Sequence, residues 1–232
     1  MNPKVIFKAP STLAQQCYVQ LQYEVIEGIL KPGEKLKIEP LKQRFNIGQS
    51  PIREALSRLV AFGLVDAEDN KGFRVATISE ADIRDTYATF TYIENKALEL
   101  AIERGNDAWE ASIVAELHKL SLIENQQRAE SYTIWAEQNY NFHVALISGC
   151  NSPTLFELRR TLYMKFDRYC RMAYALTQDN LPSNYEEHKK IAHAALERNV
   201  KKIHMLMSHH INGPIETIIK KFKENNLFKG NT

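Results

Sequence analysis

Cysteines and long apolar runs are both scarce in this chain. The three cysteines, Cys17, Cys150 and Cys170, are odd in number and widely spaced, which fits neither a disulfide framework nor a cysteine zinc motif. We therefore expect them to be reduced packing residues. No apolar run approaches the length that crosses a bilayer, and the N-terminal residues lack the apolar block of a signal peptide. These absences predict a cytoplasmic protein with no membrane partner.

The chain also has little net charge, but that charge is unevenly distributed. The formal net charge is +2, with 44% hydrophobic and 25% charged residues, a composition typical of a globular protein with a core. Residues 1–77 carry 11 Lys and Arg against 8 Asp and Glu, whereas residues 78–232 carry 19 against 20. The first third of the chain is therefore the part in which we expect a polyanionic partner to bind.

The first third has the element order helix, helix, turn, helix, hairpin. Apolar spacing predicts helices over 13–30, 41–45 and 50–62, a turn at 46–48, and strands at 64–67 and 73–76. Ser50-Pro51 has the chemistry of a helix start, because serine can cap free backbone amides and proline suits the first helical position. This order is that of a winged helix-turn-helix.

After Thr77 the sequence reads as entirely helical. Glycine there is confined to Gly105, Gly149, Gly213 and Gly230, and no strand-like alternation remains. The expected helices cover 79–103, 107–130, 133–147, 154–176, 185–198 and 200–222, opened by a capping box at Ser79 and by Asp107 as the second cap. The expected fold class is mainly α, with an N-terminal winged helix-turn-helix and a C-terminal all-α six-helix bundle. The expected boundaries are an arm (1–12), the winged helix (13–77), the helical domain (78–225) and a tail (226–232).

A recognition helix places a few side chains in the major groove of DNA. Arginine can bind guanine through two hydrogen bonds, and Arg53 lies in the first turn of the helix that enters the groove in this architecture. The predicted DNA-binding residues are Gln49, Ser50, Arg53, Arg58, Lys71 and Gly72, the last two at the tip of the wing. The alternative is a solvated charged face on a core helix.

Three histidines in the helical domain are expected to face inward. Asn139 and His143 are four residues apart on one helix face, while His188 and His210 lie on apolar stripes of later helices. Imidazole nitrogens with one oxygen donor suit zinc or nickel. The alternative is that each histidine is an ordinary core residue. The other histidines, His118, His193, His204 and His209, are competing candidates.

The sequence resembles a known family of bacterial regulators. The resemblance lies in the segments 27–36, 50–59, 63–65 and 72–75, which look like the GntR family, and the helical remainder resembles the ligand-binding (FCD) domain of its FadR branch. Phe142-His143 with Gly149-Cys150, and the segment 71–76, are similar to CsiR/GlaR-like repressors of glutarate and 4-aminobutyrate catabolism. The resemblance implies a homodimer that binds palindromic operator DNA, with one winged helix on each half-site. Many members carry arginine where this chain has Gln49.

The resemblance also implies a ligand set and an effector class. FadR-branch domains often hold a divalent metal with one Asp and three His, and the matching positions here are Asn139, His143, His188 and His210. The implied effector is a small organic acid, such as a glutarate-like or 2-hydroxyglutarate-like carboxylate, whose binding releases a repressor from DNA. Arg159 and Arg168 are candidates for holding the far end of the acid, with surface or dimer salt bridges as the alternative. Phe90 stands where many members have arginine.

Two other functions compete with a regulator. A metal-dependent hydrolase with a DNA-targeting module would need an open metal position beside a general base, and no HExxH-type arrangement is present. Binding of double-stranded RNA or of any DNA sequence would give steep salt dependence without preference for a palindrome. We therefore predict no enzyme activity and no catalytic residues. Pro214 cannot donate a hydrogen bond to the carbonyl of His210, so we expect a kink there.

Overall fold

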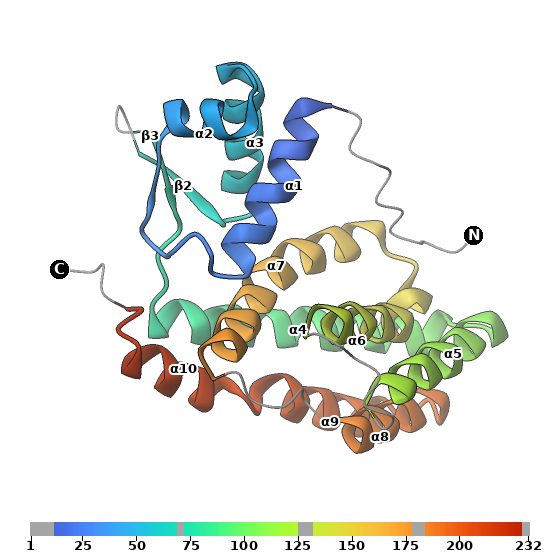
Figure 1. The fold of residues 1–232 in the computed structure, drawn as a ribbon. Coiled ribbons are helices and arrows are strands. Elements are labelled where there is room, and N and C mark those ends of the chain that lie inside the picture. Colours follow the sequence, from blue (N-terminus) through green and yellow to red (C-terminus); the bar gives the residue numbers. More distant parts are fainter. Residues whose placement is uncertain (1–11, 69–71, 125–131, 178–183, 229–232) are drawn as a thin grey trace. The chain divides into compact units, whose positions relative to one another are not determined.

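The computed structural model describes residues 12–68, 72–124, 132–177 and 184–228 of the chain. The fold is mainly helical with one small three-stranded sheet, which confirms the predicted class (Figure 1). The chain divides into two compact units. One contains the described residues up to Asp82, together with Met164–Leu176 and the residues from Lys221 on; the other contains Ile83–Tyr163 and Thr177–Lys220.

Three helices and a short turn form the helix-turn-helix. They are α1 (Leu13–Ile26), α2 (Ile38–Phe45) and α3 (Gln49–Ala61). Thr12 caps α1 by accepting a hydrogen bond from the amide of Gln15 at 3.1 Å. Helix α2 ends at Asn46, whose backbone is left-handed with φ 50°, so the predicted turn at 46–48 is confirmed.

The predicted serine cap of α3 is wrong. The N-cap is Gly48, which has no side chain to offer, and Ser50 already lies inside the helix. Pro51 is tolerated because the amides of a first helical turn have no partner within the helix. The helix ends at Phe62, and Gly63 follows with φ +64°, a conformation that favours glycine.

A three-stranded sheet completes the winged helix. Its strands are β1 (Lys35–Leu36), β2 (Val65–Glu68) and β3 (Gly72–Val75), in the order β1-β3-β2 and antiparallel throughout. The two predicted strands are confirmed to within one residue, whereas the two residues of β1 are too few to show a periodicity. The core between the helices and the sheet includes Leu21, Val25, Ile52, Leu56, Leu59 and Val75, all fully buried.

The remaining helices build the second part of the chain. They are α4 (Glu80–Arg104), α5 (Asp107–Glu124), α6 (Tyr132–Ile147), α7 (Pro153–Thr177), α8 (Tyr185–Leu196), α9 (Val200–Asn212) and α10 (Ile215–Glu224). Ser79 accepts a hydrogen bond from the amide of Asp82 at 3.0 Å, as the capping box predicts. The cap of α5 is Asn106 rather than Asp107, because the Asn106 side chain accepts from the amide of Trp109.

The expected six helices are seven in the described residues. One kinked helix was expected over 200–222, but the chain breaks at Gly213-Pro214 into α9 and α10. Pro214 begins the new helix as its carbonyl accepts from the amide of Ile218 at 2.9 Å. His210 thus lies in the last turn of α9, directly before the break.

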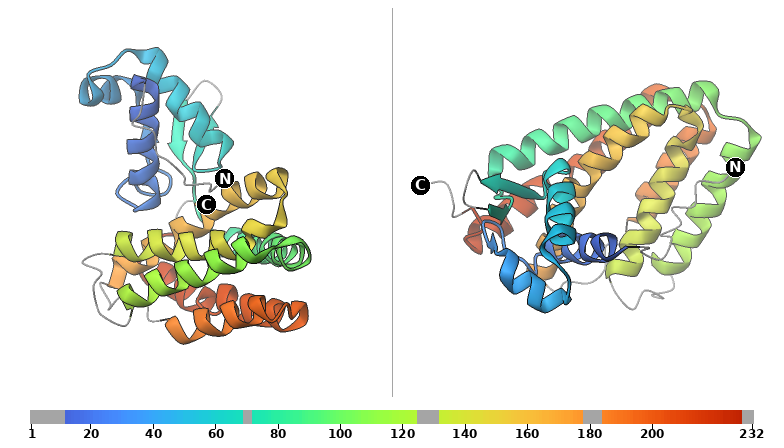
Figure 2. Two further views of the ribbon diagram at one scale, coloured as in Figure 1. Left: turned by 90° about the vertical axis from the view of Figure 1, so that its right-hand side faces the viewer. Right: turned by 90° about the horizontal axis from the view of Figure 1, so that it is seen from above.

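In the helical domain, helices that are far apart in the sequence pack against one another. Helix α5 packs against α6 and α8, and α8 packs against α9. In the views of Figures 1 and 2, α8 and α9 form a layer alongside α4, α5 and α6. Within the described residues, no helix is long and apolar enough to cross a membrane.

Candidate functional site

The predicted base-reading residue lies exposed on the first turns of α3. Arg53 has an exposed side chain, and so do Gln49 and Ser50. With its amide oriented so that the oxygen faces the guanidinium, Gln49 accepts from Nε and Nη2 of Arg53 at 2.7 and 3.0 Å. These residues are one helical turn apart, so this contact can hold the exposed Arg53 side chain in one orientation.

Arg58 lies farther along α3 and is already engaged. Its Nη1 donates to Oε1 of Gln15 at 2.5 Å, and its guanidinium lies 4.1 Å from the centre of the Tyr18 ring. Both partners belong to α1. Arg58 thus contributes to the packing of α1 on α3, and its predicted contact with DNA stays a prediction.

The tip of the wing is exposed where it begins β3. Gly72 has φ +93°, and a Cβ there would meet no atom within 4 Å. A backbone without a side chain in open space can approach a phosphate closely. Lys71, the other predicted wing residue, lies outside the described residues.

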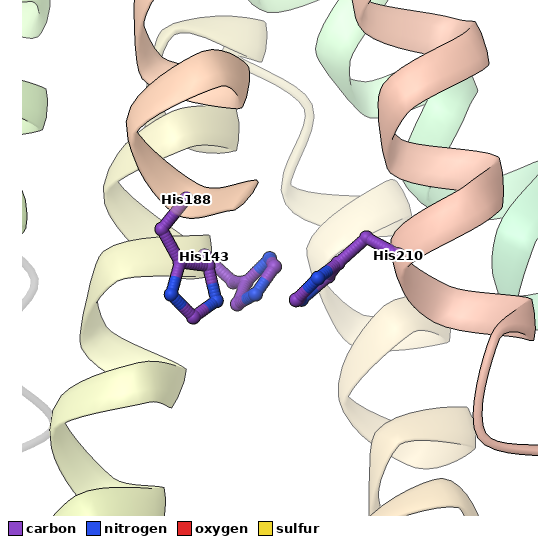
Figure 3. A group of neighbouring side chains, drawn as sticks. All are labelled: His143, His188 and His210. Atoms are coloured by element: carbon purple, nitrogen blue, oxygen red, sulfur yellow. The ribbon is translucent and has the colours of Figure 1, made fainter. Parts of the chain in front are cut away.

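Three histidines converge in the helical domain. His143 comes from α6, His188 from α8 and His210 from α9, and one ligand nitrogen of each lies within 4.8 Å of the others (Figure 3). The rings of His143 and His210 stack with centroids 5.2 Å apart, while His188 meets His210 edge-on at 4.8 Å. The sequence-predicted trio is therefore brought together. His118 and His193 lie exposed on the surface, away from the trio.

The buried imidazoles are held in their neutral form. Burial, with the neighbouring His210 and His188, holds the pKa of His143 well below its usual range. Burial also lowers the pKa of His188, against the opposing effect of Glu124. A neutral imidazole is the form that can coordinate a metal ion, since coordination needs an unprotonated nitrogen.

Each of the three histidines has a carboxylate beside its Nδ1. Glu94 of α4 lies 3.8 Å from His143, Glu124 of α5 lies 3.6 Å from His188, and Glu187 of α8 lies 2.8 Å from His210. These distances join Nδ1 to the nearest carboxylate oxygen. Of these contacts, the one between His210 and Glu187 is a hydrogen bond, which fixes the ring's tautomer and leaves its Nε2 available, as is common around metal-binding histidines. Sequence reasoning missed these roles, because the contacts join residues from different helices.

Unpaired buried atoms are concentrated around these histidines. Among the described residues, six buried side-chain nitrogen or oxygen atoms have no hydrogen-bond partner. Three of them lie at the histidines, both ring nitrogens of His188 and Oε2 of Glu124, and a fourth is Oδ1 of Asn139, one turn before His143 on α6. Buried polar atoms in native proteins are nearly always paired, so such a group points to a missing ligand. A divalent ion fits this donor set, which consists of imidazole nitrogens and one amide oxygen.

Arg159 lies near this region but is committed to another group. Its side chain is 2% exposed, and its Nε and Nη2 donate to the two carboxylate oxygens of Glu94 at 2.5 and 3.1 Å. Burial alone would lower the pKa of Arg159, but the Glu94 carboxylate outweighs it and raises the pKa. The rings of Phe90, Tyr140 and Tyr163 surround the guanidinium at 5.5 to 5.6 Å.

Arg168, the second predicted effector residue, is buried and bonded to the backbone. Its Nη2 donates to the backbone carbonyl of Ala76 at 2.8 Å, and burial lowers its pKa to about 10. Its predicted contact with the effector stays a prediction.

A winged helix-turn-helix with an exposed arginine on α3, joined to a helical domain, defines a DNA-binding regulator. Comparison with protein-family models agrees with this class. The model of the bacterial regulatory proteins of the gntR family matches residues 13–75, and the FCD domain model matches residues 85–213. The chain belongs to the GntR family, in the group whose members carry an FCD domain. Its helical domain is of a kind in which a bound metal ion is common.

Characterised and uncharacterised relatives are regulators of the same architecture. The repressor GlaR of Escherichia coli is 34% identical over 87% of this chain and 93% of its own length. BphR of Paraburkholderia xenovorans, an uncharacterized regulator, is 33% identical over 91% of this chain and 86% of its own. Because the families and these relatives are transcriptional regulators, the protein is a regulator and not an enzyme, and the hydrolase alternative is not supported.

Solved structures share the fold. McbR/YncC of E. coli superposes with a TM-score of 0.73 at 21% identity, covering 91% of this chain and 99% of that chain. A GntR regulator from Rhodococcus sp. RHA1 gives 0.65 at 20% identity, covering 89% and 97%. These likenesses support the winged helix and the helical domain as one known architecture.

Proposed function

We propose that the protein is a homodimeric repressor that binds a palindromic operator and is released from it by a small organic acid. The relative GlaR is a transcriptional repressor, which supports this sign of regulation. The exposed Arg53, with Gln49 and Ser50 beside it, reads bases in each half-site, and the exposed Gly72 brings the wing backbone to a phosphate.

The effector site lies at the three histidines. The observation that carries this proposal is the concentration there of buried atoms without partners. Asn139, His143, His188 and His210 would hold a divalent ion, either zinc or nickel. Such an ion supplies a positive centre at which a carboxylate can bind. Burial keeps the imidazoles of His143 and His188 neutral, and the hydrogen bond to Glu187 fixes the orientation of the His210 ring.

The effector is most simply a carboxylate of the glutarate or 2-hydroxyglutarate kind. Arg159 is a buried cation whose charge Glu94 already balances. Two of its five donor hydrogens are engaged, so its Nη1 is the group that can still meet an acid. The rings of Phe90, Tyr140 and Tyr163 lie beside its guanidinium.

Calorimetry tests this site directly. We expect glutarate to bind zinc-loaded protein and to bind chelator-treated protein at least ~10-fold more weakly, because the carboxylate loses its positive centre. A matched compound without ionic charge, such as the diamide of glutarate, should bind neither form. Equal binding of glutarate to both forms would refute a role for the metal in effector recognition.

A further inference from the structure

The three carboxylates that face the histidines are not equivalent in charge balance. Glu94 is paired with Arg159, so its charge is already matched. The side chain of Glu187 is 47% exposed, where water screens its charge. Glu124 is different, because its side chain is 0% exposed and it has no cationic partner within the described ranges.

Glu124 is nevertheless held in a defined position. Its Oε1 accepts a hydrogen bond from Nε1 of Trp135 at 2.9 Å. Its Oε2 is buried without a hydrogen bond and lies 3.6 Å from Nδ1 of His188, which is likewise without a partner. The carboxylate therefore faces one histidine of the trio, with one oxygen anchored and the other unused.

An unbalanced buried carboxylate is costly, and it persists most readily where a cation binds nearby. The side chains of the proposed metal site carry no charge of their own. Asn139 brings an amide oxygen without charge, and an imidazole that coordinates a metal ion is neutral. A divalent ion held there would find no negative charge among these side chains.

We propose that Glu124 supplies, through His188, the negative charge that the amide at position 139 does not supply. This inference rests on the proposed metal site and goes beyond it by assigning the charge balance to a residue outside the ligand set. Glu124 is a positioning residue: its Oε2 faces Nδ1 of His188 at 3.6 Å, and a carboxylate in this place strengthens the donor character of Nε2.

The first test is the zinc affinity of Glu124→Gln, measured by competition with a chelating dye. Glutamine keeps an oxygen for Trp135 but removes the charge. We expect zinc to bind ~10- to 100-fold more weakly, the range typical for loss of an outer carboxylate. The melting temperature of the metal-free variant should stay the same or rise, because an unbalanced buried charge has been removed. A merely structural glutamate would instead lower that temperature and leave zinc affinity unchanged.

The second test is rescue by an aspartate. Asn139→Asp should restore most of the zinc affinity lost in Glu124→Gln, and it should add less than ~10-fold to the wild-type protein, where the charge is already present. Glu110→Gln is the matched control, since Glu110 lies on the same helix, pairs with Arg198 and should leave zinc affinity unchanged. The Asn139→Asp single variant also tests the idea if Glu124→Gln fails to fold.

The outcomes separate two failures. Wild-type affinity for zinc in Glu124→Gln, or equal gains from Asn139→Asp with and without Glu124, would overturn the role of Glu124 while leaving the metal site in place. Absence of zinc binding in the wild-type protein would overturn the metal site and this inference together.

Discussion

Replacement of Arg53 by alanine is expected to abolish sequence-specific DNA binding. A bidentate arginine contact with guanine contributes about 1–3 kcal/mol of discrimination. In a dimer on a palindrome the loss occurs in both half-sites, which gives roughly a 30-fold or greater loss of affinity. The measurement is fluorescence anisotropy with a palindrome selected by the wild-type protein from random duplexes, compared with a scrambled duplex.

Two further variants distinguish base reading from attraction of charge and from loss of folding. Arg53→Lys keeps the positive charge but cannot make the bidentate contact, so it should retain non-specific binding and lose preference for the palindrome. Arg58→Ala should lower the melting temperature instead, because it removes the hydrogen bond to Gln15 and the contact with Tyr18. Undiminished preference for the palindrome in Arg53→Ala would show that another residue reads the bases.

Replacement of His188 by leucine is expected to separate metal binding from folding. His188 is 0% exposed and neither ring nitrogen has a hydrogen-bond partner. An apolar side chain of similar volume removes unsatisfied buried atoms, so the metal-free variant should melt at the same temperature or higher. Wild-type protein at a zinc concentration 100 times its dissociation constant should gain about 2.7 kcal/mol, roughly 5–10 °C in melting temperature. The variant should lose that gain.

The comparison variant is His193→Gln. His193 is 67% exposed on the same helix and pairs with Glu197, so its loss should leave the zinc-induced shift intact. An unchanged zinc-induced shift in His188→Leu would place the ion elsewhere. A collapse of the metal-free variant would instead make His188 a structural residue.

Much of the fold could be predicted because it depends on local pattern. Helical spacing in α3 and in the helical domain, and the capping box at Ser79, are read from neighbouring residues. The errors are local too. Gly48 and Asn106, rather than Ser50 and Asp107, cap their helices, since several polar residues lay close enough to compete for each end. The sequence predicts a kink before Pro214, and the structure has a full break between α9 and α10 at this position.

Within the candidate site, the sequence predicts the three histidines but not the carboxylates beside them. His143, His188 and His210 could be chosen because each lies on the apolar stripe of its own helix. Glu94, Glu124 and Glu187 could not, because their contacts with the histidines depend on how α4, α5 and α8 pack. The pairing of Arg159 with Glu94 also needed the tertiary structure, and it changes Arg159 from a free cation into a balanced one.

A dimeric regulator whose helical domain holds a metal ion at the three histidines can be tested in one experiment. The measurement is native mass spectrometry of protein purified without chelator, combined with elemental analysis. We expect a mass of two chains with about one zinc or nickel ion per chain, lost in His188→Leu. A dimer that stays free of metal in the presence of excess zinc would contradict the metal site and leave the histidines as core residues.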